Sequence, residues 1–273
     1  MYDDYLLPSI KAAVMAGDNI LLVYNTDFTV TEKSDRSPLT LADKYSHDTL
    51  IGHLTGFGLP IISEEGKDIP YRERKKWDYF WMIDPLDGTK EFIQRNGEFT
   101  VNIALIHINT PVLGIVFIPV SGTLYFSVPR LGAYKLENPD IHTALKMGGQ
   151  DVDLETLIQK SQQLPDHEFT HTRFTIVGSR SHSTPELQSY VEKKRQEYGD
   201  IDFISLGSSL KFCAIAEGRA DVYPRLGPTM EWDTAAGQAI AENAGAQVLC
   251  YNTNTPLVYN KENLLNPWFV VTR

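Results

Sequence analysis

Cysteine is scarce in this 273-residue sequence, which contains only Cys213 and Cys250. Both lie among apolar residues, so we expect buried, reduced thiols rather than a disulfide. No Cys-x-x-Cys or Cys/His spacing of a zinc site is present.

Basic residues are also in deficit, with 25 Lys and Arg against 35 Asp and Glu and a formal net charge of −10. This balance argues against non-specific binding to nucleic acid, which requires a basic surface.

Long apolar runs are absent as well. No run approaches the roughly 18 residues that span a membrane, so we expect no transmembrane segment. The first residues, MYDDYLLPSIKAA, lack the basic start and the apolar core of a signal peptide. The default location is therefore the cytoplasm. The composition, 42% hydrophobic and 22% charged, is that of an ordinary globular protein, and the sequence leaves its oligomeric state open.

The first half of the chain has an α+β pattern. Apolar residues at helical spacing predict helices over 6–24 and over 37–54. In the second of these helices, Leu41, Tyr45, Leu50 and Leu54 are expected on one side. Short apolar strands are predicted at 59–63 and 79–83, followed by three β-rich runs at 97–108, 112–120 and 123–128. These three runs indicate an antiparallel meander.

The second half has an α/β pattern. A polar stretch over 137–172 predicts a linker or an excursion with one short helix near 153–163. After it, strand-like runs alternate with helices predicted at 185–198, 210–217 and 234–243, which is typical of an α/β layer structure. We therefore predict an N-terminal domain over 1–137 and a C-terminal domain over 138–273.

The segment Trp81–Phe92, WMIDPLDGTKEF, places Asp84 and Asp87 in a turn directly after an apolar run. Pro85 fixes φ near about −65°, and Gly88 permits a backbone conformation that other residues resist. Such a turn could aim two carboxylates and an intervening carbonyl into one space. Hard cations such as Mg²⁺ accept this set of oxygen ligands. Acids in a Pro-Gly turn are, however, equally common without any function.

Two more acidic positions lie next to predicted elements. Glu64 and Glu65 follow the strand at 59–63, and Asp233 would be the N-cap of the helix that begins at Thr234. Taken singly, the glutamates suggest a solvated pair and the aspartate a helix cap. Taken together with the turn, they favour a cation site, because burying several carboxylates is costly unless a cation neutralises them.

Anion-binding candidates follow other strands. In SLGSSLKF, residues 205–212, a strand ends, the chain turns at Gly207 and a helix begins with Lys211 in its first turn. Free N–H groups at a helix N-terminus bind phosphate, although a plain serine cap explains the same residues. Further polar candidates follow two other strands: Ser179, Arg180, His182 and Arg225.

These features together resemble the inositol monophosphatase superfamily of lithium-sensitive, magnesium-dependent phosphomonoesterases. The resemblance rests on the Glu-Glu pair, Asp-Pro-Leu-Asp-Gly-Thr and Trp-Asp-Thr-Ala-Ala-Gly, in this order. Within the superfamily, the sequence motifs most resemble those of the bacterial 3'(2'),5'-bisphosphate nucleotidases. The segments concerned are SPLTLAD, ISEE, DPLDGTKEFIQRNGEFTVNIALI, SRSH, GSSLKFCAIAEGRADVYPRLGPT and WDTAAG. Only the polar stretch over roughly 138–170 departs from the family pattern.

The resemblance implies a two-domain sugar-phosphatase fold with α-β-α-β-α layers, and it assigns roles to matching positions. The implied metal ligands are Glu64, Asp84, Asp87, Asp233 and the backbone carbonyl of Leu86, most of them in the N-terminal domain. The implied water-activating dyad is Asp43 and Thr89. The implied nucleotide-binding residues are Gly88, Ser179, His182, Ser208, Lys211 and Arg225, with Arg180 as a further candidate. Glu65 would serve a third metal or a water.

The activity that the resemblance implies is hydrolysis of the 3'-phosphate of adenosine 3',5'-bisphosphate to AMP and phosphate, with two or three Mg²⁺ ions and inhibition by lithium. The implied role is recycling of a by-product of sulfate assimilation, in the cytoplasm or peripherally on the inner face of its membrane. Two alternatives stay open. One is a phosphatase for inositol phosphates or fructose 1,6-bisphosphate. The other is a non-catalytic metal- or nucleotide-binding sensor, which would lack a water-activating group, yet Asp43 and Thr89 are both present.

Overall fold

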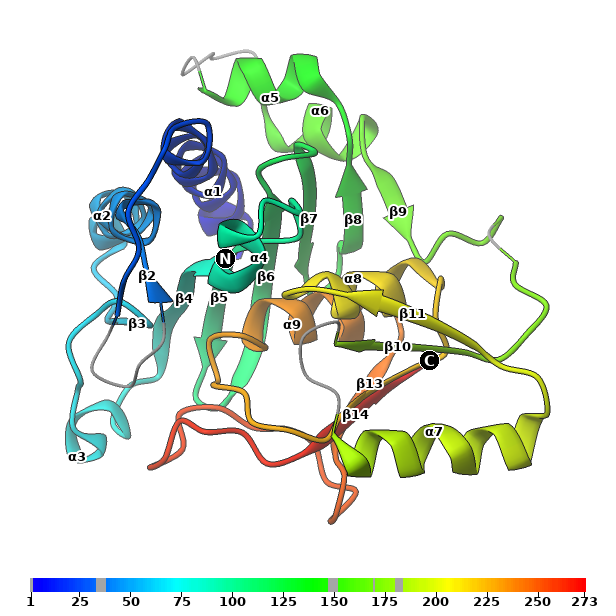
Figure 1. The fold of residues 1–273 in the computed structure, drawn as a ribbon. Helices are drawn as coiled ribbons and strands as arrows, with labels where there is room; N and C mark the ends of the chain where they lie inside the picture. Colours follow the sequence, from blue (N-terminus) through cyan, green and yellow to red (C-terminus); the bar gives the residue numbers. More distant parts are fainter. Residues whose placement is uncertain (1, 33–37, 147–151, 169, 180–183) are drawn as a thin grey trace.

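The computed structural model of the chain describes residues 2–32, 38–146, 152–168, 170–179 and 184–273. Two β-sheets and their helices stack as alternating layers (Figure 1). In order, these are α1 (Asp3–Tyr24) with α2 (Leu41–Leu54), a seven-stranded sheet, α8 (Leu210–Glu217) with α9 (Ala235–Asn243), a five-stranded sheet, and α7 (Pro185–Tyr198). The predicted α-β-α-β-α fold is therefore confirmed.

The larger sheet is an antiparallel meander with one parallel strand at its edge. Its strands, in spatial order, are β3 (Ile61–Ser63), β4 (Tyr79–Asp87), β5 (Thr100–His107), β6 (Thr110–Ile118), β7 (Thr123–Val128), β8 (Gly132–Leu136) and β9 (Gln162–Leu164). Among the described strands of this sheet, β3 and β4 pair in parallel and the other neighbours pair antiparallel. The predicted strands and the meander are confirmed, whereas β8 and β9 were not predicted.

Helices α1 and α2 cover one face of this sheet. The apolar stripe of α1, including Leu6, Ile10, Val14 and Ile20, is fully buried against it. By length and composition alone, Asp4–Tyr24 is apolar enough to cross a membrane, but 56% of its most apolar window is buried inside the protein. In the fold, α1 is thus a core helix of the first layer.

The buried face of α2 differs from the prediction. Leu50 and Leu54 are buried, but Leu41 and Tyr45 are about half exposed. The side that faces the protein instead includes Asp43 and Ser46. The prediction placed these four side chains on one face, whereas the first turns of α2 bury polar side chains instead. This polar side lies beside the C-terminal end of β4 and the first residue of α4.

The middle layer packs tightly against the larger sheet. Gly114 in β6 lies directly beneath α9, and a Cβ atom there would come within 2.4 Å of the backbone oxygen of Ala236. A Cβ at Gly237 would likewise lie 2.6 Å from the Phe212 ring, where α9 meets α8. Bare backbone at both positions allows α9 to approach its neighbours closely.

The smaller sheet completes the C-terminal half. Its strands, in spatial order, are β11 (Asp202–Leu206), β10 (Thr175–Ser179), β12 (Val222–Arg225), β14 (Phe269–Thr272) and β13 (Gln247–Cys250). The first three are parallel and the last two pairings antiparallel. The strand β14 was not predicted. Both cysteines are free thiols, with Cys213 buried and Cys250 only partly so.

The polar stretch over 137–172 forms more structure than the single short helix predicted. Besides β9, its described residues contain α5 (Pro139–Lys146) and α6 (Leu154–Gln159). The remaining elements are short: β1 (Thr31–Glu32), β2 (Pro38–Leu39), η1 (Thr55–Phe57), α3 (Tyr71–Arg74) and α4 (Thr89–Ile93). Because β9 pairs with β8, the larger sheet contains residues from both sides of position 137. The division into 1–137 and 138–273 stays a prediction.

Candidate active site

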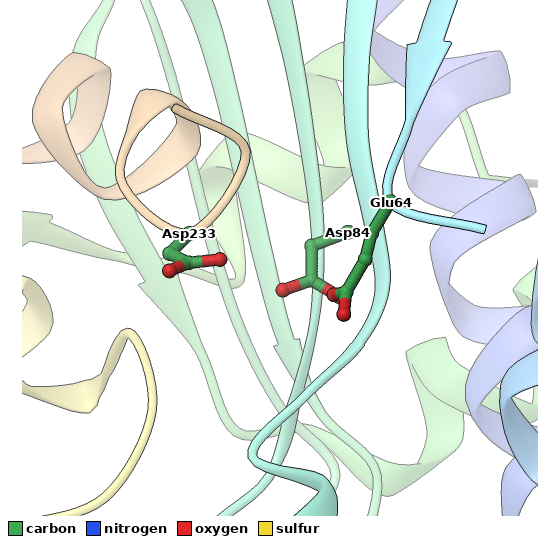
Figure 2. Close-up of side chains that lie close together, drawn as sticks. All are labelled: Glu64, Asp84 and Asp233. Atoms are coloured by element: carbon green, nitrogen blue, oxygen red, sulfur yellow. The ribbon is translucent and has the colours of Figure 1, made fainter. Parts of the chain in front are cut away.

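Three carboxylates from distant parts of the chain converge between the two halves of the molecule. Glu64 follows β3, Asp84 lies in β4, and Asp233 precedes α9, and each offers an oxygen within 4.8 Å of the others (Figure 2). The parallel pairing of β3 with β4 brings the first two side by side. The contact of α9 with the larger sheet brings the third to them.

The electrostatics of these acids indicate a site for positive charge. Burial raises the pKa of Asp84 well above its ordinary value, and the neighbouring Glu64 adds to this. Burial and the charge of Asp87 raise the pKa of Asp233 to about 8. Carboxylates forced together in this way favour a bound cation, and carboxylate oxygens are the ligands that Mg²⁺ and similar hard cations prefer. The residues present therefore fit a metal ion.

The irregular C-terminal end of β4 is fixed by hydrogen bonds of its own residues and of α2. The β4–β5 pairing shifts register between Asp84 and Asp87. The backbone N–H of Leu86 donates to Oδ1 of Asp84 at 3.1 Å, and the hydroxyl of Ser46 donates to the Pro85 oxygen at 2.6 Å. Gly88 adopts a φ of 92°, a conformation that disfavours any side chain. The sequence DPLDGT thus forms a kinked turn.

Asp43 and Thr89 form the contact expected of a water-activating pair. Oδ2 of Asp43 accepts from both the backbone N–H and the hydroxyl of Thr40, at 2.7 and 2.8 Å. Its other oxygen, Oδ1, accepts from the hydroxyl of Thr89 at 3.3 Å. The same hydroxyl lies 3.4 Å from the backbone oxygen of Leu86. The cap of α2 thereby fixes a carboxylate against the first residue of α4.

Asp87 lies outside the group of three converging carboxylates. Its Oδ2 atom accepts hydrogen bonds from Ser208 at 2.8 Å, Ser209 at 3.2 Å and Asn102 at 3.3 Å. Burial raises the pKa of Asp87, while the charge of Lys211 and these hydrogen bonds oppose the rise. Its environment therefore differs from that of Asp84, although both belong to one turn.

A cavity of about 270 Å³ opens beside these acids. Its lining includes Asp87, Asp233 and two cationic side chains, Lys211 and Arg225. Lys211 is buried, which lowers the pKa of its ammonium group to about 8. The Nε atom of Arg225 is buried and has no hydrogen-bond partner in the described part of the chain. Carboxylates and cations thus share one cavity, as binding of a phosphate with metal ions requires.

Most residues predicted for the site lie around this cavity or the acid cluster. The cavity is lined by Gly88, Thr89, Ser179, Ser208, Lys211, Arg225, Asp87 and Asp233. Arg180 and His182 lie outside the described residues. Glu65 is not part of the converging carboxylates, and its backbone N–H donates to the Ser63 hydroxyl at 3.3 Å.

One local prediction was wrong. Asp233 is not the N-cap of α9, because that position belongs to Thr234. Instead, Oδ2 of Asp233 accepts from the Met230 N–H at 2.9 Å, which turns the carboxylate back toward its own loop. The sequence also did not reveal Thr100, Asn102 and Ser209, which contact Asp87 or its partners. The signal in the sequence that could have indicated them is the pair of polar residues, Thr100 and Asn102, within the apolar run FTVNIALI.

Comparison with known proteins identifies the class. The sequence profile of the inositol monophosphatase family matches residues 2–268, and the chain belongs to this family. The structure of inositol monophosphatase from Anabaena (Nostoc) sp. PCC 7120 superposes with a TM-score of 0.70 at 21% identity, over 98% of this chain and 90% of that one. This more distant likeness shows the shared fold.

Relatives with higher sequence identity carry the name of one particular enzyme of this family. The chain is 42% identical to the 3'(2'),5'-bisphosphate nucleotidase CysQ of Shigella flexneri, over 94% of this chain and 95% of that protein. It is 41% identical, over the same shares, to CysQ of Escherichia coli K12. The crystal structure of CysQ from Bacteroides thetaiotaomicron, a bacterial member of the inositol monophosphatase family, superposes with a TM-score of 0.91 at 46% identity, covering 100% of this chain and 98% of that one.

Proposed function

We propose that this protein is a magnesium-dependent phosphomonoesterase that hydrolyses the 3'-phosphate of adenosine 3',5'-bisphosphate to AMP and phosphate. The observation that carries the proposal is the convergence of Glu64, Asp84 and Asp233 beside a cavity that also presents Lys211 and Arg225. Relatives named 3'(2'),5'-bisphosphate nucleotidase, at 41–42% identity over most of the chain, support the choice of substrate.

The metal site would comprise Glu64, Asp84, Asp87, Asp233 and the backbone oxygen of Leu86. Bound Mg²⁺ ions, two or three in number, would neutralise phosphate charge and lower the pKa of a bound water. The protein supplies the ligands from a rigid frame. Asp84 is fixed by its own turn and Asp87 by three hydrogen-bond donors. Lithium would inhibit by taking one of the metal positions.

Asp43 and Thr89 would handle the proton of the attacking water. The Thr89 hydroxyl would accept a proton from the water as it donates its own to Oδ1 of Asp43, 3.3 Å away. The two hydrogen bonds from Thr40 to Oδ2 keep the acceptor oxygen of Asp43 turned toward Thr89. General-base assistance of this kind contributes roughly 10²- to 10⁴-fold to a rate.

The nucleotide would lie in the 270 Å³ cavity. Lys211 and Arg225 would contact its second phosphate, because both are cations at the cavity wall and the Arg225 Nε lacks a partner among the described residues. Gly88, Ser179 and Ser208 would line the sugar side, and His182 and Arg180, outside the described residues, would lie beyond Ser179. Glu65 would serve a third metal or a water. We place the enzyme in the cytoplasm or peripherally on the inner face of the cytoplasmic membrane.

A panel assay tests this proposal. Phosphate release would be measured from adenosine 3',5'-bisphosphate, inositol monophosphate and fructose 1,6-bisphosphate, each with Mg²⁺ and with or without lithium. We expect the nucleotide to be the best substrate by at least roughly 10-fold in kcat/KM. Unlike inositol monophosphate it has a second phosphate for the cationic position, and unlike fructose 1,6-bisphosphate it has a base as well as a sugar to fill the cavity. Preference for either sugar phosphate would reject the nucleotidase assignment. Absence of any turnover would favour a binding protein instead.

A further inference from the structure

Resting on the proposed function, we infer that Thr100 is a positioning residue for the metal site. Together with Asn102, Ser208 and Ser209, it forms a hydrogen-bonded cluster that orients the carboxylate of Asp87. This cluster, called here the β5 relay, links the N-terminal strand β5 with the β11–α8 loop of the C-terminal half. Thr100 itself is not among the residues that line the cavity, so its role would be to position other side chains and not to contact substrate.

The relay acts on one oxygen of Asp87. All three donors, Ser208, Ser209 and Asn102, reach Oδ2 at distances between 2.8 and 3.3 Å. Within the described part of the chain, no hydrogen bond reaches Oδ1. Ser209 has one hydroxyl proton, which it shares between this oxygen and the backbone oxygen of Asp233. A carboxylate held at one oxygen by several donors is restricted in rotation, so the other oxygen keeps a constant direction. In this way the relay would present Oδ1 to a metal ion.

Thr100 is the branching point of the relay. Its hydroxyl lies 2.9 Å from Oδ1 of Asn102 and 2.6 Å from the hydroxyl of Ser208. Because the Ser208 proton goes to Asp87, the single proton of Thr100 is shared between the Ser208 oxygen and Oδ1 of Asn102. Its share toward Oδ1 of Asn102 leaves the amide NH₂ group facing Asp87 and Ser209. Thr100 is fully buried, so water does not replace its hydroxyl. Removing this one hydroxyl therefore loosens both Asn102 and Ser208 without touching a metal ligand.

The relay also connects the two halves of the site. Ser209 lies 3.2 Å from Oδ2 of Asp87 and 3.0 Å from the backbone oxygen of Asp233. Ser208 has a left-handed φ of 48°, which costs a non-glycine residue free energy and persists only where neighbours enforce it. The N–H of Gly207 donates to Glu98 at 2.8 Å, which holds the same loop against the N-terminal half. A strained backbone, together with several hydrogen bonds to the N-terminal half, indicates that the β11–α8 loop is held in one position relative to Asp87.

Metal titration tests the inference. Mn²⁺ binding would be measured without substrate, by electron paramagnetic resonance of the free ion, in wild type, Thr100→Val and Thr100→Ser. Valine keeps the shape and removes the hydroxyl, whereas serine keeps it. We expect Thr100→Val to weaken Mn²⁺ binding about 10-fold, because groups that orient metal ligands contribute roughly this much to affinity. Thr100→Ser should restore binding to within about 2-fold of wild type.

A matched control separates positioning from a general loss of packing. Thr123 is also a buried threonine of the larger sheet, with its hydroxyl bonded to Ser121 and Glu137 rather than to the site. Thr123→Val should bind Mn²⁺ like wild type. If Thr100→Val does not fold, Ser209→Ala replaces it, with the same weakened binding expected.

The outcomes are distinguishable. Wild-type affinity in folded Thr100→Val, or in Ser209→Ala where the valine variant does not fold, overturns the inference. If the wild type hydrolyses the nucleotide at the same time, the proposed function stands and the inference alone fails. If the wild type binds no Mn²⁺ and releases no phosphate, both fail together. Equal weakening by Thr123→Val also overturns the inference, because the effect would then be one of general stability.

Discussion

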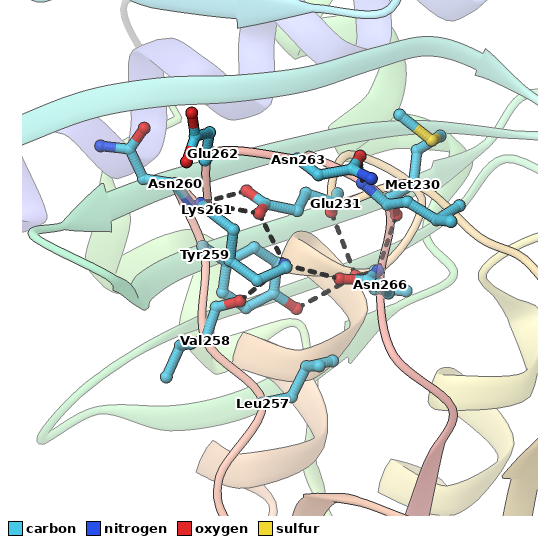
Figure 3. Close-up of polar contacts among 12 residues, drawn as sticks. Met230, Glu231, Leu257, Val258, Tyr259, Asn260, Lys261, Glu262, Asn263 and Asn266 are labelled. Atoms are coloured by element: carbon cyan, nitrogen blue, oxygen red, sulfur yellow. Dashed lines mark hydrogen bonds and ion pairs between the residues drawn. The ribbon is translucent and has the colours of Figure 1, made fainter. Parts of the chain in front are cut away.

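The Nζ of Lys261 lies 2.6 Å from Oε1 of Glu231, a carboxylate that is fully buried only two residues before Asp233 (Figure 3). Glu231 also accepts from the backbone N–H groups of Asn260 and Lys261, at 2.6 and 3.0 Å. The segment around residue 260 is thereby attached to the loop that leads into α9. The position of Asp233 depends on this attachment.

The variant Lys261→Met should reduce the free energy of unfolding by about 2–4 kcal/mol, because it leaves the buried charge of Glu231 with backbone donors only. Urea unfolding measures this. The control is Arg195→Met, whose partner Glu192 lies 3.7 Å away with both side chains more than half exposed. It should change stability by less than about 1 kcal/mol. Equal losses in the two variants would contradict a special role for the buried pair.

The variant Asp87→Asn should lower kcat by roughly 10²- to 10³-fold, because the site loses a negative charge where metal and phosphate meet. The fold should persist, since asparagine has the same shape and can still accept from Ser208. Phosphate release and circular dichroism would be measured together, with exposed Asp4→Asn as the control. Near-normal turnover in the Asp87 variant would refute its role as a metal ligand.

Thr89 is expected to act through its hydroxyl. Thr89→Val should lower kcat by roughly 10²-fold with a small change in KM, because proton transfer to Asp43 is lost while the binding cavity keeps its shape. Thr89→Ser should retain most of the activity. Steady-state kinetics on adenosine 3',5'-bisphosphate give the two constants separately. A valine variant that changes KM alone would assign Thr89 to substrate binding instead.

A pH effect on stability should arise at Glu242, near the C-terminal end of α9. Burial raises the pKa of this carboxyl from 4.5 to about 7, although the hydrogen bond from Gln238 lowers it. The folded state therefore retains a proton that the unfolded state has lost. Its stabilising contribution is complete below about pH 4.5 and is lost as pH rises toward 7.

The measurement compares wild type with Glu242→Gln in urea at pH 5 and pH 8. Glutamine stays neutral, so the variant should gain on the order of 1–3 kcal/mol relative to wild type between these two pH values. The Gln238 amide can turn to suit the new partner. A stability difference that stays constant with pH would show that Glu242 has an ordinary pKa.

Contiguous motifs were predictable from the sequence. DPLDGT specifies its own turn, because Pro85 and Gly88 restrict the backbone and Asp84 bonds to the N–H of Leu86 two residues later. The order of strands in the meander and the bounds of α7 and α8 also followed from apolar spacing. Such features depend on interactions within a few residues of each other.

Features that depend on distant pairing could not be predicted. Asn102 and Ser209 reach Asp87 from 15 and 122 residues away along the chain, and a single sequence contains no record of such contacts. Similarly, β9 and β14 are short strands that exist because a neighbouring strand pairs with them. The exposed side of α2 was missed because the early turns of this helix bury Asp43 in place of Leu41.

The close approach of Gly114 to Ala236 has a consequence for how the protein tolerates change. This helix–sheet contact helps to set the distance between Asp233 and the acids of the N-terminal half. A single methyl group at position 114 would lift α9 and disperse the acid cluster without altering one of its members.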